Sequence, residues 1–390
     1  MAMAAARRGG QVMLHAYRSH VGRSSATVYD GAAVGQRLLL ALLVLIGLDA
    51  PEARAITVPS GFRLEVFAEK LGGARGLAVD PSGVLLVSVP SKGRVVAVPN
   101  RGRHVLLLAD LELPHGLAFR RGSLYVAETG RIVRYRYDAA TLRAVEPTVV
   151  VGGLPPGAHH WTRSIAFGPD DKLYVAVGSS CDVCEERDPR RAAIIQYAAD
   201  GSGERLFARG LRNPVGLGFH PTTRALWTTV NERDWPDGGA PPDYVTEVRA
   251  GASYGWPHCF AERRIWRPDP TWAGLRDCRA GTLPTLELPP HSAPLGLAFY
   301  TGAEFPRDYA GDLFIALHGS RTGLPAAGYK IVRARLRGGR VVGVEDFASG
   351  WRRGDHVIGR PVDLVVGRDG SLYVSDDHGD RIYRVSYGRR

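Results

Sequence analysis

The sequence predicts an all-β protein, a six-bladed β-propeller of four-stranded antiparallel blades around a central channel. Three observations support this fold class. A unit of two short apolar strands joined by a polar turn occurs six times. The copies follow one another at roughly 40 to 50 residues, with longer gaps where loops are inserted, which is the spacing of propeller blades. Residues that favour turns are abundant, with 48 Gly and 26 Pro among 390 residues.

The repeated unit opens with a strand at or near a glycine, turns through Pro, Gly or Asp, and ends in a second strand of alternating residues. Its copies cover residues 76–90, 116–129, 164–178, 215–230, 295–319 and 362–377. A third strand follows most copies, as in RIVRYRY and RIYRVSY. Short strands separated by regular turn signals predict antiparallel blades with almost no helix.

One strand, GFRLEVFAE over residues 61–69, precedes the first copy. Phe62, Leu64 and Val66 fall on one face and charged residues on the other, which is the alternation of a strand. We expect this strand to pair with the last blade, beside RIYRVSY, and to close the ring. Closure would remove a sheet edge that otherwise invites aggregation.

The first 55 residues are predicted to be an N-terminal extension that ends in an export signal. Arg37 precedes the apolar run LLLALLVLIGL, and Ala53-Arg54-Ala55 forms an A-x-A cleavage pattern. The run is too short to span a bilayer, which takes about 20 residues. A buried helix is the alternative, but the run lacks a polar face. We predict a propeller domain over 56–390 that is periplasmic or secreted, without stable insertion of the mature chain in a membrane.

The longest departure from the repeat lies at about 231–291, between the fourth and fifth copies. Long irregular insertions in compact domains are usually functional or disordered. This one contains several aromatic residues, the motif YGWP and two cysteines. That composition predicts an ordered insertion.

The formal charge of +11 raises the question of nucleic-acid binding. The basic residues are almost all Arg and are scattered, with no block of five or six. We therefore expect no nucleic-acid partner. A positive surface also attracts an anionic cofactor, and this pattern fits that role at least as well.

Four cysteines in an exported chain predict disulfides. Cys181 with Cys184 and Cys259 with Cys278 is the economical pairing, because each closes a local loop. A closed zinc site is disfavoured, since the second pair lacks the C-x2-C spacing. A redox C-x-x-C is the other alternative, but such motifs normally open a helix, whereas this one follows a strand.

Polar residues stand where three of the predicted inner strands begin. His160 precedes the third copy, Arg212-Asn213 the fourth and Arg360 the sixth. Loops that enter inner strands line the mouth of a propeller channel, so a neutral imidazole there is placed as a general base. Together these residues predict a pocket for an anionic, planar molecule. The alternatives are a surface histidine and inter-blade ion pairs; His115 and His318 are expected to be structural.

An acidic loop follows the fourth copy and offers hard oxygen atoms of the kind that calcium prefers. Its polar members are Asn231, Glu232, Asp234, Asp237 and Asp243. Asp243 stands directly before a predicted strand, which places it more firmly than the others. No D-x-D-x-D-G run occurs, so the loop is not an EF-hand. The alternative is a solvated connection without a metal.

Residues 60–387 resemble the soluble, quinone-dependent glucose/sorbosone dehydrogenases, six-bladed propellers that bind pyrroloquinoline quinone and calcium. The resemblance is carried by HHWTRSIAFGPDDKLYVAVGS, GLRNPVGLGFHPTTRALW, NERD, YGWP and GRPVDLVVGRDGSLYVSDD. The Cys-x-x-Cys after the third copy and NERD are most similar to the sorbosone-dehydrogenase-like branch.

The resemblance implies a role for each matching residue. His160 would be the catalytic base; Arg212, Asn213 and Arg360 would bind the quinone; Asp243 and Tyr254 would lie at the calcium side. The chain departs from the family pattern at a second set of positions. Val362 replaces an arginine, Tyr244 an acid and Ser179 an acid that orients the base, and no lysine other than Lys330 lies near the expected contact to a quinone carboxylate.

The sequence therefore predicts an exported quinoprotein oxidoreductase. It would oxidise an aldose or sugar aldehyde by hydride transfer to pyrroloquinoline quinone and pass electrons to an unidentified acceptor. A non-catalytic propeller that binds or scaffolds other molecules is the first alternative. A calcium-dependent lactonase-like hydrolase is a further one, but it needs Glu, Asn and Asp at strand entries that here hold mainly His and Arg.

Overall fold

A computed structural model describes residues 55–157, 159–235, 240–272, 274, 278 and 281–388. All of them belong to one unit of the chain, residues 48–390. The predicted N-terminal extension and export signal lie outside the described residues except for Ala55, and Asp237 of the acidic loop lies outside them too. Within the described residues, no helix is long and apolar enough to cross a membrane.

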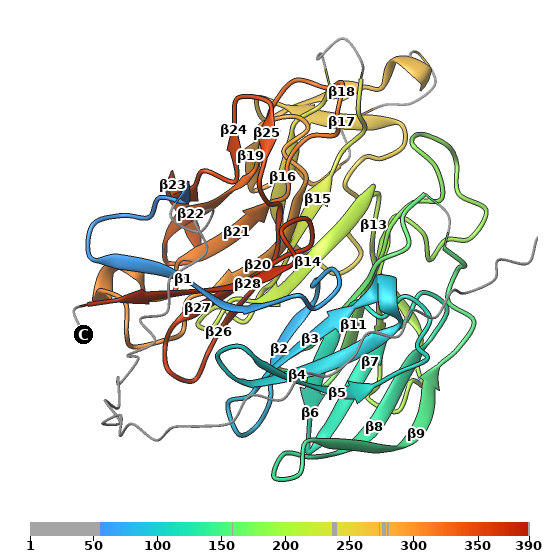
Figure 1. Ribbon diagram of the computed structural model, residues 1–390. Helices are drawn as coiled ribbons and strands as arrows, with labels where there is room; N and C mark the ends of the chain where they lie inside the picture. The colour runs from blue at the N-terminus through green and yellow to red at the C-terminus, as the bar shows by residue number, and fades with distance from the viewer. Residues whose placement is uncertain are drawn as a thin grey trace, which may run out of the picture. The chain divides into compact units, whose positions relative to one another are not determined.

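The described residues form six four-stranded antiparallel sheets arranged as the blades of a propeller (Figure 1), which confirms the predicted fold class. Blade one comprises β2 (Leu77–Val79), β3 (Leu85–Val89), β4 (Arg94–Asn100) and β5 (Arg103–Leu108). Blade two comprises β6 (Leu117–Arg120), β7 (Ser123–Ala127), β8 (Ile132–Asp138) and β9 (Arg143–Val151). Blade three comprises β10 (Arg163–Phe167), β11 (Leu173–Val177), β12 (Ala193–Tyr197) and β13 (Arg205–Arg209).

The second half of the ring repeats this order with longer connections. Blade four comprises β14 (Asn213–Phe219), β15 (Leu226–Asn231), β16 (Asp243–Val248) and β19 (Leu286–Leu288). Blade five comprises β20 (Pro294–Phe299), β21 (Leu313–Leu317), β22 (Lys330–Arg337) and β23 (Arg340–Ser349). Blade six comprises β26 (Pro361–Val366), β27 (Leu372–Asp376), β28 (Arg381–Tyr387) and β1 (Phe62–Glu69).

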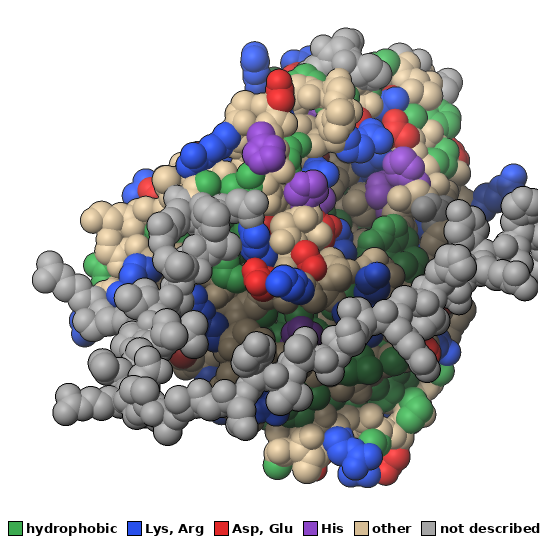
Figure 2. All heavy atoms as spheres, viewed as in Figure 1, with side chains coloured by type: hydrophobic (Ala, Val, Ile, Leu, Met, Phe, Trp, Pro, Cys, Tyr) green, Lys and Arg blue, Asp and Glu red, His purple; other side chains and the backbone are tan. Residues whose placement is uncertain are grey.

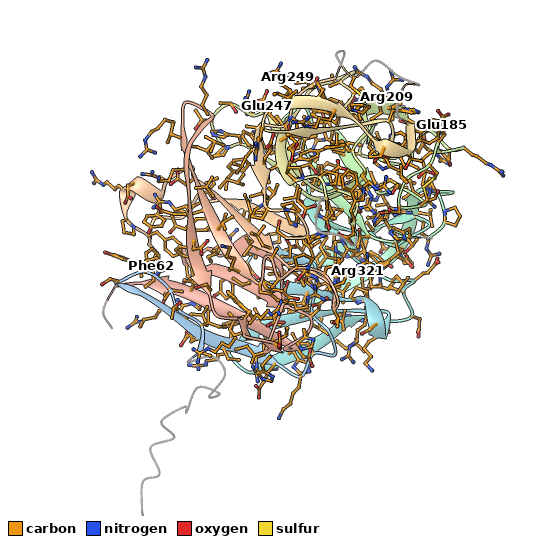
Figure 3. All side chains as sticks on the ribbon, turned by 90° about the horizontal axis from the view of Figure 1, so that it is seen from above. Phe62, Glu185, Arg209, Glu247, Arg249 and Arg321 are labelled. Carbon is orange, nitrogen blue, oxygen red and sulfur yellow. A yellow bond between two sulfur atoms is a disulfide. The ribbon has the colours of Figure 1, made fainter. Side chains whose placement is uncertain are left out.

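The N-terminal strand closes the ring, as the sequence predicted. β1 pairs antiparallel with β28, from Phe62 opposite Tyr387 to Glu69 opposite Arg381. Phe62, at the outer end of β1 in Figure 3, is buried and packs edge-on against Phe305 and Phe347 of blade five. The strand thus covers the last sheet edge and also contacts the preceding blade.

The hydrophobic core lies between neighbouring blades. The cluster between blades two and three includes Ile132 and Val175, and the cluster between blades four and five includes Trp227 and Ile315. The second strand of a blade is covered on both faces, and all five residues of β21 are buried. This double coverage explains why the second strands are apolar almost throughout.

Glycines at the start of the inner strands let neighbouring blades approach each other. A Cβ atom on Gly76 would overlap the carbonyl oxygen of His115, and one on Gly216 would overlap that of Leu295. Backbone packing around the channel therefore requires glycine at these two positions.

The long segment between blades four and five is partly blade and partly insertion. The stretch 231–291 includes β16 and β19, which complete blade four. Between them lie the hairpin β17 (Cys259–Glu262) and β18 (Ile265–Pro268) and the short helix η3 (Pro270–Trp272). Both predicted disulfides, Cys181–Cys184 and Cys259–Cys278, are present. A second small hairpin, β24 (Arg352–Arg353) with β25 (His356–Val357), precedes blade six.

We predict that Phe62→Ala lowers the free energy of unfolding by about 3–5 kcal/mol, the usual cost of removing a buried phenylalanine ring. Denaturant unfolding of the purified protein measures this. Arg63→Ala, an exposed change on the same strand, should alter stability by no more than about 0.5 kcal/mol. Equal effects of the two changes would contradict a structural role for ring closure.

Candidate active site

Loops from blades three to six surround a cavity of about 330 Å³. Its lining includes His159, His160, Arg212, Asn213, Asn231, Glu232, Asp234, Asp243, His291, His318, Arg321 and Arg360. Histidine, basic and acidic side chains lie close together on the face shown in Figure 2. Polar groups of both signs in one concave site are what a ligand site requires.

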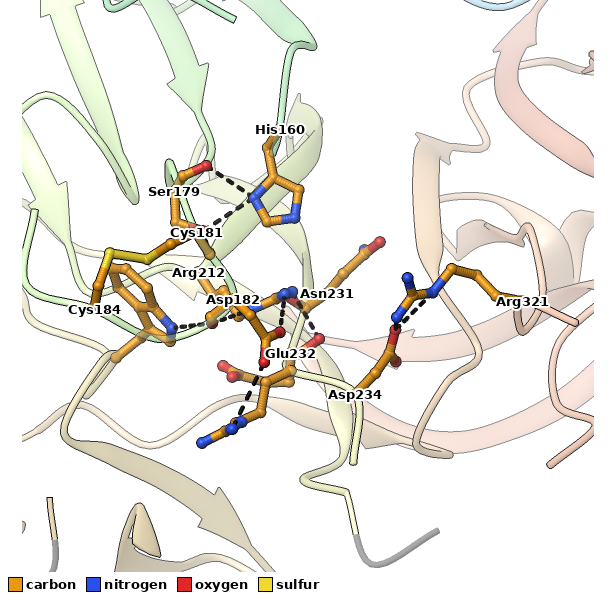
Figure 4. Close-up of polar contacts among 12 residues, drawn as sticks. His160, Ser179, Cys181, Asp182, Cys184, Arg212, Asn231, Glu232, Asp234 and Arg321 are labelled. Atoms are coloured by element: carbon orange, nitrogen blue, oxygen red, sulfur yellow. Dashed lines mark hydrogen bonds and ion pairs between the residues drawn. A yellow bond between two sulfur atoms is a disulfide. The ribbon is translucent and has the colours of Figure 1, made fainter. Parts of the chain in front are cut away.

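His160 lies just before β10, and a single residue that follows β11, Ser179, holds its ring. Its Nδ1 is 3.0 Å from both the carbonyl oxygen and the Oγ of Ser179. A carbonyl oxygen only accepts, and Ser179 Oγ donates its own proton to the carbonyl of Cys181 at 2.7 Å. Nδ1 therefore carries the hydrogen, and Nε2 carries the lone pair. Figure 4 shows Nε2 on the side of the ring away from Ser179.

The surroundings keep His160 neutral. Burial lowers the pKa of the imidazole to about 2, and the nearby Arg212 and His159 act in the same direction, whereas the hydrogen bond to the Ser179 carbonyl opposes them. Burial disfavours the charged form of histidine, and nearby cations add to that effect. His160 is thus a neutral imidazole, with its hydrogen on Nδ1 and its lone pair on Nε2.

Arg212 lies directly before β14 and is almost fully buried, at 4% exposure. Its Nη1 donates to the carbonyl oxygens of Asn231 and Glu232 at 3.2 and 2.8 Å. Its Nε and Nη2 donate to the carbonyl oxygen and the Oδ1 of Asp182 at 2.9 and 2.6 Å. The predicted anion-binding arginine is therefore held rigidly by its own protein, with its charge beside the cavity.

Asn213 is the first residue of β14, and its buried Oδ1 has no hydrogen-bond partner among the described residues. A Cβ on Gly178 would come within 2.5 Å of that oxygen and 2.6 Å of the Cβ of His160. Gly178 therefore allows Asn213 and His160 to lie against each other. An unpaired buried amide oxygen at a cavity wall is available to a ligand or a water.

Arg360 and Arg321 bring two further cations to the cavity from blades five and six. Arg360, before β26, donates to the carbonyl oxygens of His318 and Ser320 at 3.1 and 2.9 Å. Arg321 donates from Nη2 to Asp234 Oδ2 at 2.6 Å, and Asp234 Oδ1 contacts His291 Nδ1 at 2.7 Å. In Figure 4 the Asp234–Arg321 pair lies across the cavity from His160.

Two buried carboxyl groups stand at the cavity floor. Asp243 Oδ1 accepts from the amide of Glu232 at 2.8 Å, and its Oδ2 accepts from the amide of Ala293 at 2.8 Å. Burial raises the pKa of Asp243 to about 7 and that of Glu232 to about 8, the latter in spite of Arg212. Both carboxyl groups therefore have pKa values near neutral pH, in a cavity that three arginines also line.

The residues expected at the calcium side do not meet at this cavity. Tyr254 packs in the core between blades three and four, and its hydroxyl donates to the carbonyl oxygen of Glu247 at 2.8 Å. Among the described residues, the only group of three possible metal ligands is Cys181, Cys184 and Glu186, whose two cysteines form a disulfide. Calcium binding stays a prediction.

The departures from the family pattern have structural explanations. Val362 is buried beside Val215 and Leu295, where the inner strands meet. Tyr244 belongs to the core between blades three and four. Lys330 pairs with Asp346 at 2.7 Å on the outer strands of blade five, and it does not line the cavity.

The structure adds site residues that the sequence did not single out. Asp182, His291 and Arg321 contact cavity residues from loops without any periodic pattern. His115 lines a second, smaller cavity of about 120 Å³ on the channel axis, and His318 pairs with Asp377 at 2.9 Å. The available signals were the position of Asp182 next to a cysteine and that of His291 before a strand, whereas Arg321 had neither.

A family model described as TrAA12-like matches residues 56–236 and 241–388. The chain belongs to the TrAA12-like family. An uncharacterised protein of Borreliella burgdorferi is 28% identical to this TrAA12-like chain over 90% of its length and 96% of the relative. A pyrroloquinoline quinone-dependent pyranose dehydrogenase of Coprinopsis cinerea is 26% identical over 86% of this chain. That match spans only 55% of the relative's length.

A calcium structure of a Trichoderma reesei family AA12 carbohydrate-active enzyme superposes with a TM-score of 0.74 at 21% identity, covering 85% of this TrAA12-like chain and 97% of that one. At this identity the likeness concerns the fold. The family match and the named relative confirm the resemblance to quinone-dependent sugar dehydrogenases. The sorbosone-dehydrogenase-like branch stays a prediction.

We predict that His160 makes this TrAA12-like protein less stable in acid. Below about pH 6.5 the unfolded chain binds a proton at this histidine that the folded chain does not bind, so stability falls as the pH falls. His160→Gln should reduce the slope of unfolding free energy against pH, between about 6.5 and 4, by up to about 1.4 kcal/mol per pH unit. Denaturant unfolding at a series of pH values measures the slope, and His104→Gln, on an exposed outer strand, is the control.

Proposed function

We propose that this TrAA12-like protein is a sugar dehydrogenase that uses pyrroloquinoline quinone, with His160 as general base. The observation that carries the proposal is a neutral His160 with a free Nε2 beside a cavity that holds three arginines. The named pyranose dehydrogenase relative supports the same oxidoreductase class.

The lining of the cavity fits an anionic quinone. Pyrroloquinoline quinone carries carboxylates on a planar ring system, and Arg212, Arg321 and Arg360 supply positive charge on three sides of one cavity. Planar guanidinium groups suit carboxylates in particular. The unpaired oxygen of Asn213 adds a polar contact. When bound, the quinone supplies the carbon that accepts a hydride from the sugar.

The chain itself supplies a base and a fixed electrostatic environment. Ser179 holds Nδ1–H, so Nε2 of His160 can take the proton from a sugar hydroxyl as the adjacent C–H bond loses its hydride. The pKa of His160 is low partly because Arg212 is positive. Negative charge in the cavity would offset Arg212 and raise this pKa, which makes His160 a stronger base when the site is loaded.

Several finer features of the proposal extend beyond this chemistry. We propose an aldose or a sugar aldehyde as the substrate, an unidentified electron acceptor, and an export signal that ends near residue 55. Two disulfides fit an oxidising compartment. N-terminal sequencing of the mature protein tests the proposed boundary between the extension, residues 1–55, and the propeller domain, residues 56–390. The mature chain should begin at Ile56 or a near neighbour.

Calcium remains part of the proposal. Each carboxylate oxygen of Asp243 already accepts a backbone N–H, and Tyr254 lies away from the cavity. A dependence of quinone affinity on added calcium, compared before and after chelation, decides whether the loaded site takes up the metal.

We predict that His160→Ala abolishes oxidation of an aldose, followed by reduction of an artificial dye, because it removes the neutral imidazole whose Nε2 is proposed to take the proton. Quinone binding, followed by absorbance titration, should persist. His104→Ala is the matched control and should keep full activity. Failure of the wild-type protein to bind the quinone would favour a non-catalytic binding propeller.

Arg360→Ala should weaken quinone binding by at least about tenfold, since it removes one of three cations at the cavity. Arg368→Ala is the control, because this exposed arginine lies in the turn at the opposite end of β26. The same absorbance titration measures both variants. Equal affinities would show that Arg360 does not face the quinone.

A further inference from the structure

The loop after β11 is closed into a small ring by the Cys181–Cys184 disulfide, three residues apart in sequence. The same loop contacts both the proposed base and the buried arginine of the site (Figure 4). One arm of the loop is Ser179, before the ring, which contacts His160 of blade three. The other arm is Asp182, within the ring, which contacts Arg212 of blade four.

The first arm reaches His160 through Ser179. Ser179 Oγ donates to the carbonyl oxygen of Cys181 at 2.7 Å, so the hydroxyl cannot turn toward another acceptor. With its proton committed, this oxygen accepts from His160 Nδ1 at 3.0 Å, beside the Ser179 carbonyl at the same distance. The Cys181 carbonyl thus keeps Ser179 Oγ as a second acceptor for His160 Nδ1, and both oxygens that fix the tautomer belong to the residue that leads into the ring.

The second arm reaches Arg212 through Asp182, which lies inside the ring. The Asp182 carbonyl oxygen accepts from Arg212 Nε at 2.9 Å and from Trp256 Nε1 at 3.2 Å. Its carboxylate accepts from Arg212 Nη2 at 2.6 Å and lies 3.6 Å from Arg233. A buried guanidinium without a charged partner is costly, so Asp182 fixes both the charge balance and the direction of Arg212.

The disulfide is poorly placed to stabilise the whole fold. Cross-links that close short loops remove little entropy from the unfolded chain, whereas Cys259–Cys278 closes a loop of 19 residues in sequence separation. A second contact joins the two ends of the loop beside the ring, since Ser180 Oγ donates to Glu186 Oε2 at 2.7 Å. Because the ring contacts residues of the site, we expect the Cys181–Cys184 disulfide to affect the site more than the stability of the whole fold.

We propose that the disulfide-closed loop 181–184 is a positioning element of the site, in which Asp182 orients Arg212 and the Cys181 carbonyl orients His160 through Ser179. Asp182 and Ser179 are positioning residues, because they act through Arg212 and His160. The proposal rests on the proposed function for its catalytic consequence, but the geometry that it describes exists without a cofactor.

The two disulfides provide a matched pair of variants. Cys181→Ser with Cys184→Ser should lower quinone affinity and kcat by about tenfold each, with little change in Tm, because preorganisation is lost at two site residues. Cys259→Ser with Cys278→Ser should lower Tm more and leave quinone affinity within about twofold. Wild-type affinity and kcat in the first variant, or losses that follow Tm in both, would overturn the proposal.

Substitutions at Asp182 separate positioning from charge. Asp182→Ala should weaken quinone binding by about tenfold, and Asp182→Asn should restore most of it, because asparagine still offers Oδ1 to Arg212. Asp188→Ala, which breaks only the nearby pair with Arg190 at 2.8 Å, is the control and should bind as the wild type does. An asparagine variant as weak as the alanine variant would contradict positioning by this hydrogen bond.

A measurement without quinone keeps this inference distinct from the proposed function. In imidazole nitrogen NMR, His160, assigned by its loss in His160→Gln, should show a protonated Nδ1 in the wild type. In the Cys181→Ser, Cys184→Ser variant the tautomers should mix. If the wild type binds no quinone, the proposed function fails. An unchanged His160 signal in the double variant overturns the positioning element itself.

Discussion

Pairing of the first strand with the last is the constraint on which the rest of the structure depends. Every blade packs its faces against two neighbours, so the apolar side chains of each sheet are covered only while the ring is complete. β1 and β28 make that ring continuous across more than 300 residues of chain. The closed ring also sets the positions of the loops at the channel mouth. The cavity between the loops of blades three to six therefore depends on ring closure.

The balance of charge at that cavity explains its chemistry. Three arginines bring positive charge, and burial holds His160 neutral and raises the pKa of Asp243 and Glu232. A site of this kind resists protonation of its base and favours an anionic occupant. Main-chain carbonyls hold Arg212 and Arg360, and the carboxylates of Asp182 and Asp234 pair with Arg212 and Arg321, so little reorganisation is needed when a ligand arrives.

Repetition made much of the site predictable. His160, Arg212-Asn213 and Arg360 stand at the entries of the third, fourth and sixth copies of one unit, and the structure brings all four residues to one cavity. Tyr254 was expected beside them but lies in an inter-blade core, because YGWP belongs to the insertion, which has no place in the repeat. Arg321 and Asp182 were missed for the same reason, since each stands in a loop whose path no local pattern specifies.

The sequence by itself determined the blades and the closing strand, because alternation and turn residues act over a few neighbouring residues. It favoured the two local disulfides as the economical pairing, which the structure contains. Only the tertiary structure decided which polar groups meet. Asp182 and Arg212 are 30 residues apart and Asp234 and Arg321 are 87 apart, and their contacts depend on how the blades are placed around the channel. Local chemistry specifies strands and turns, whereas a site between blades exists only when packing brings distant loops together.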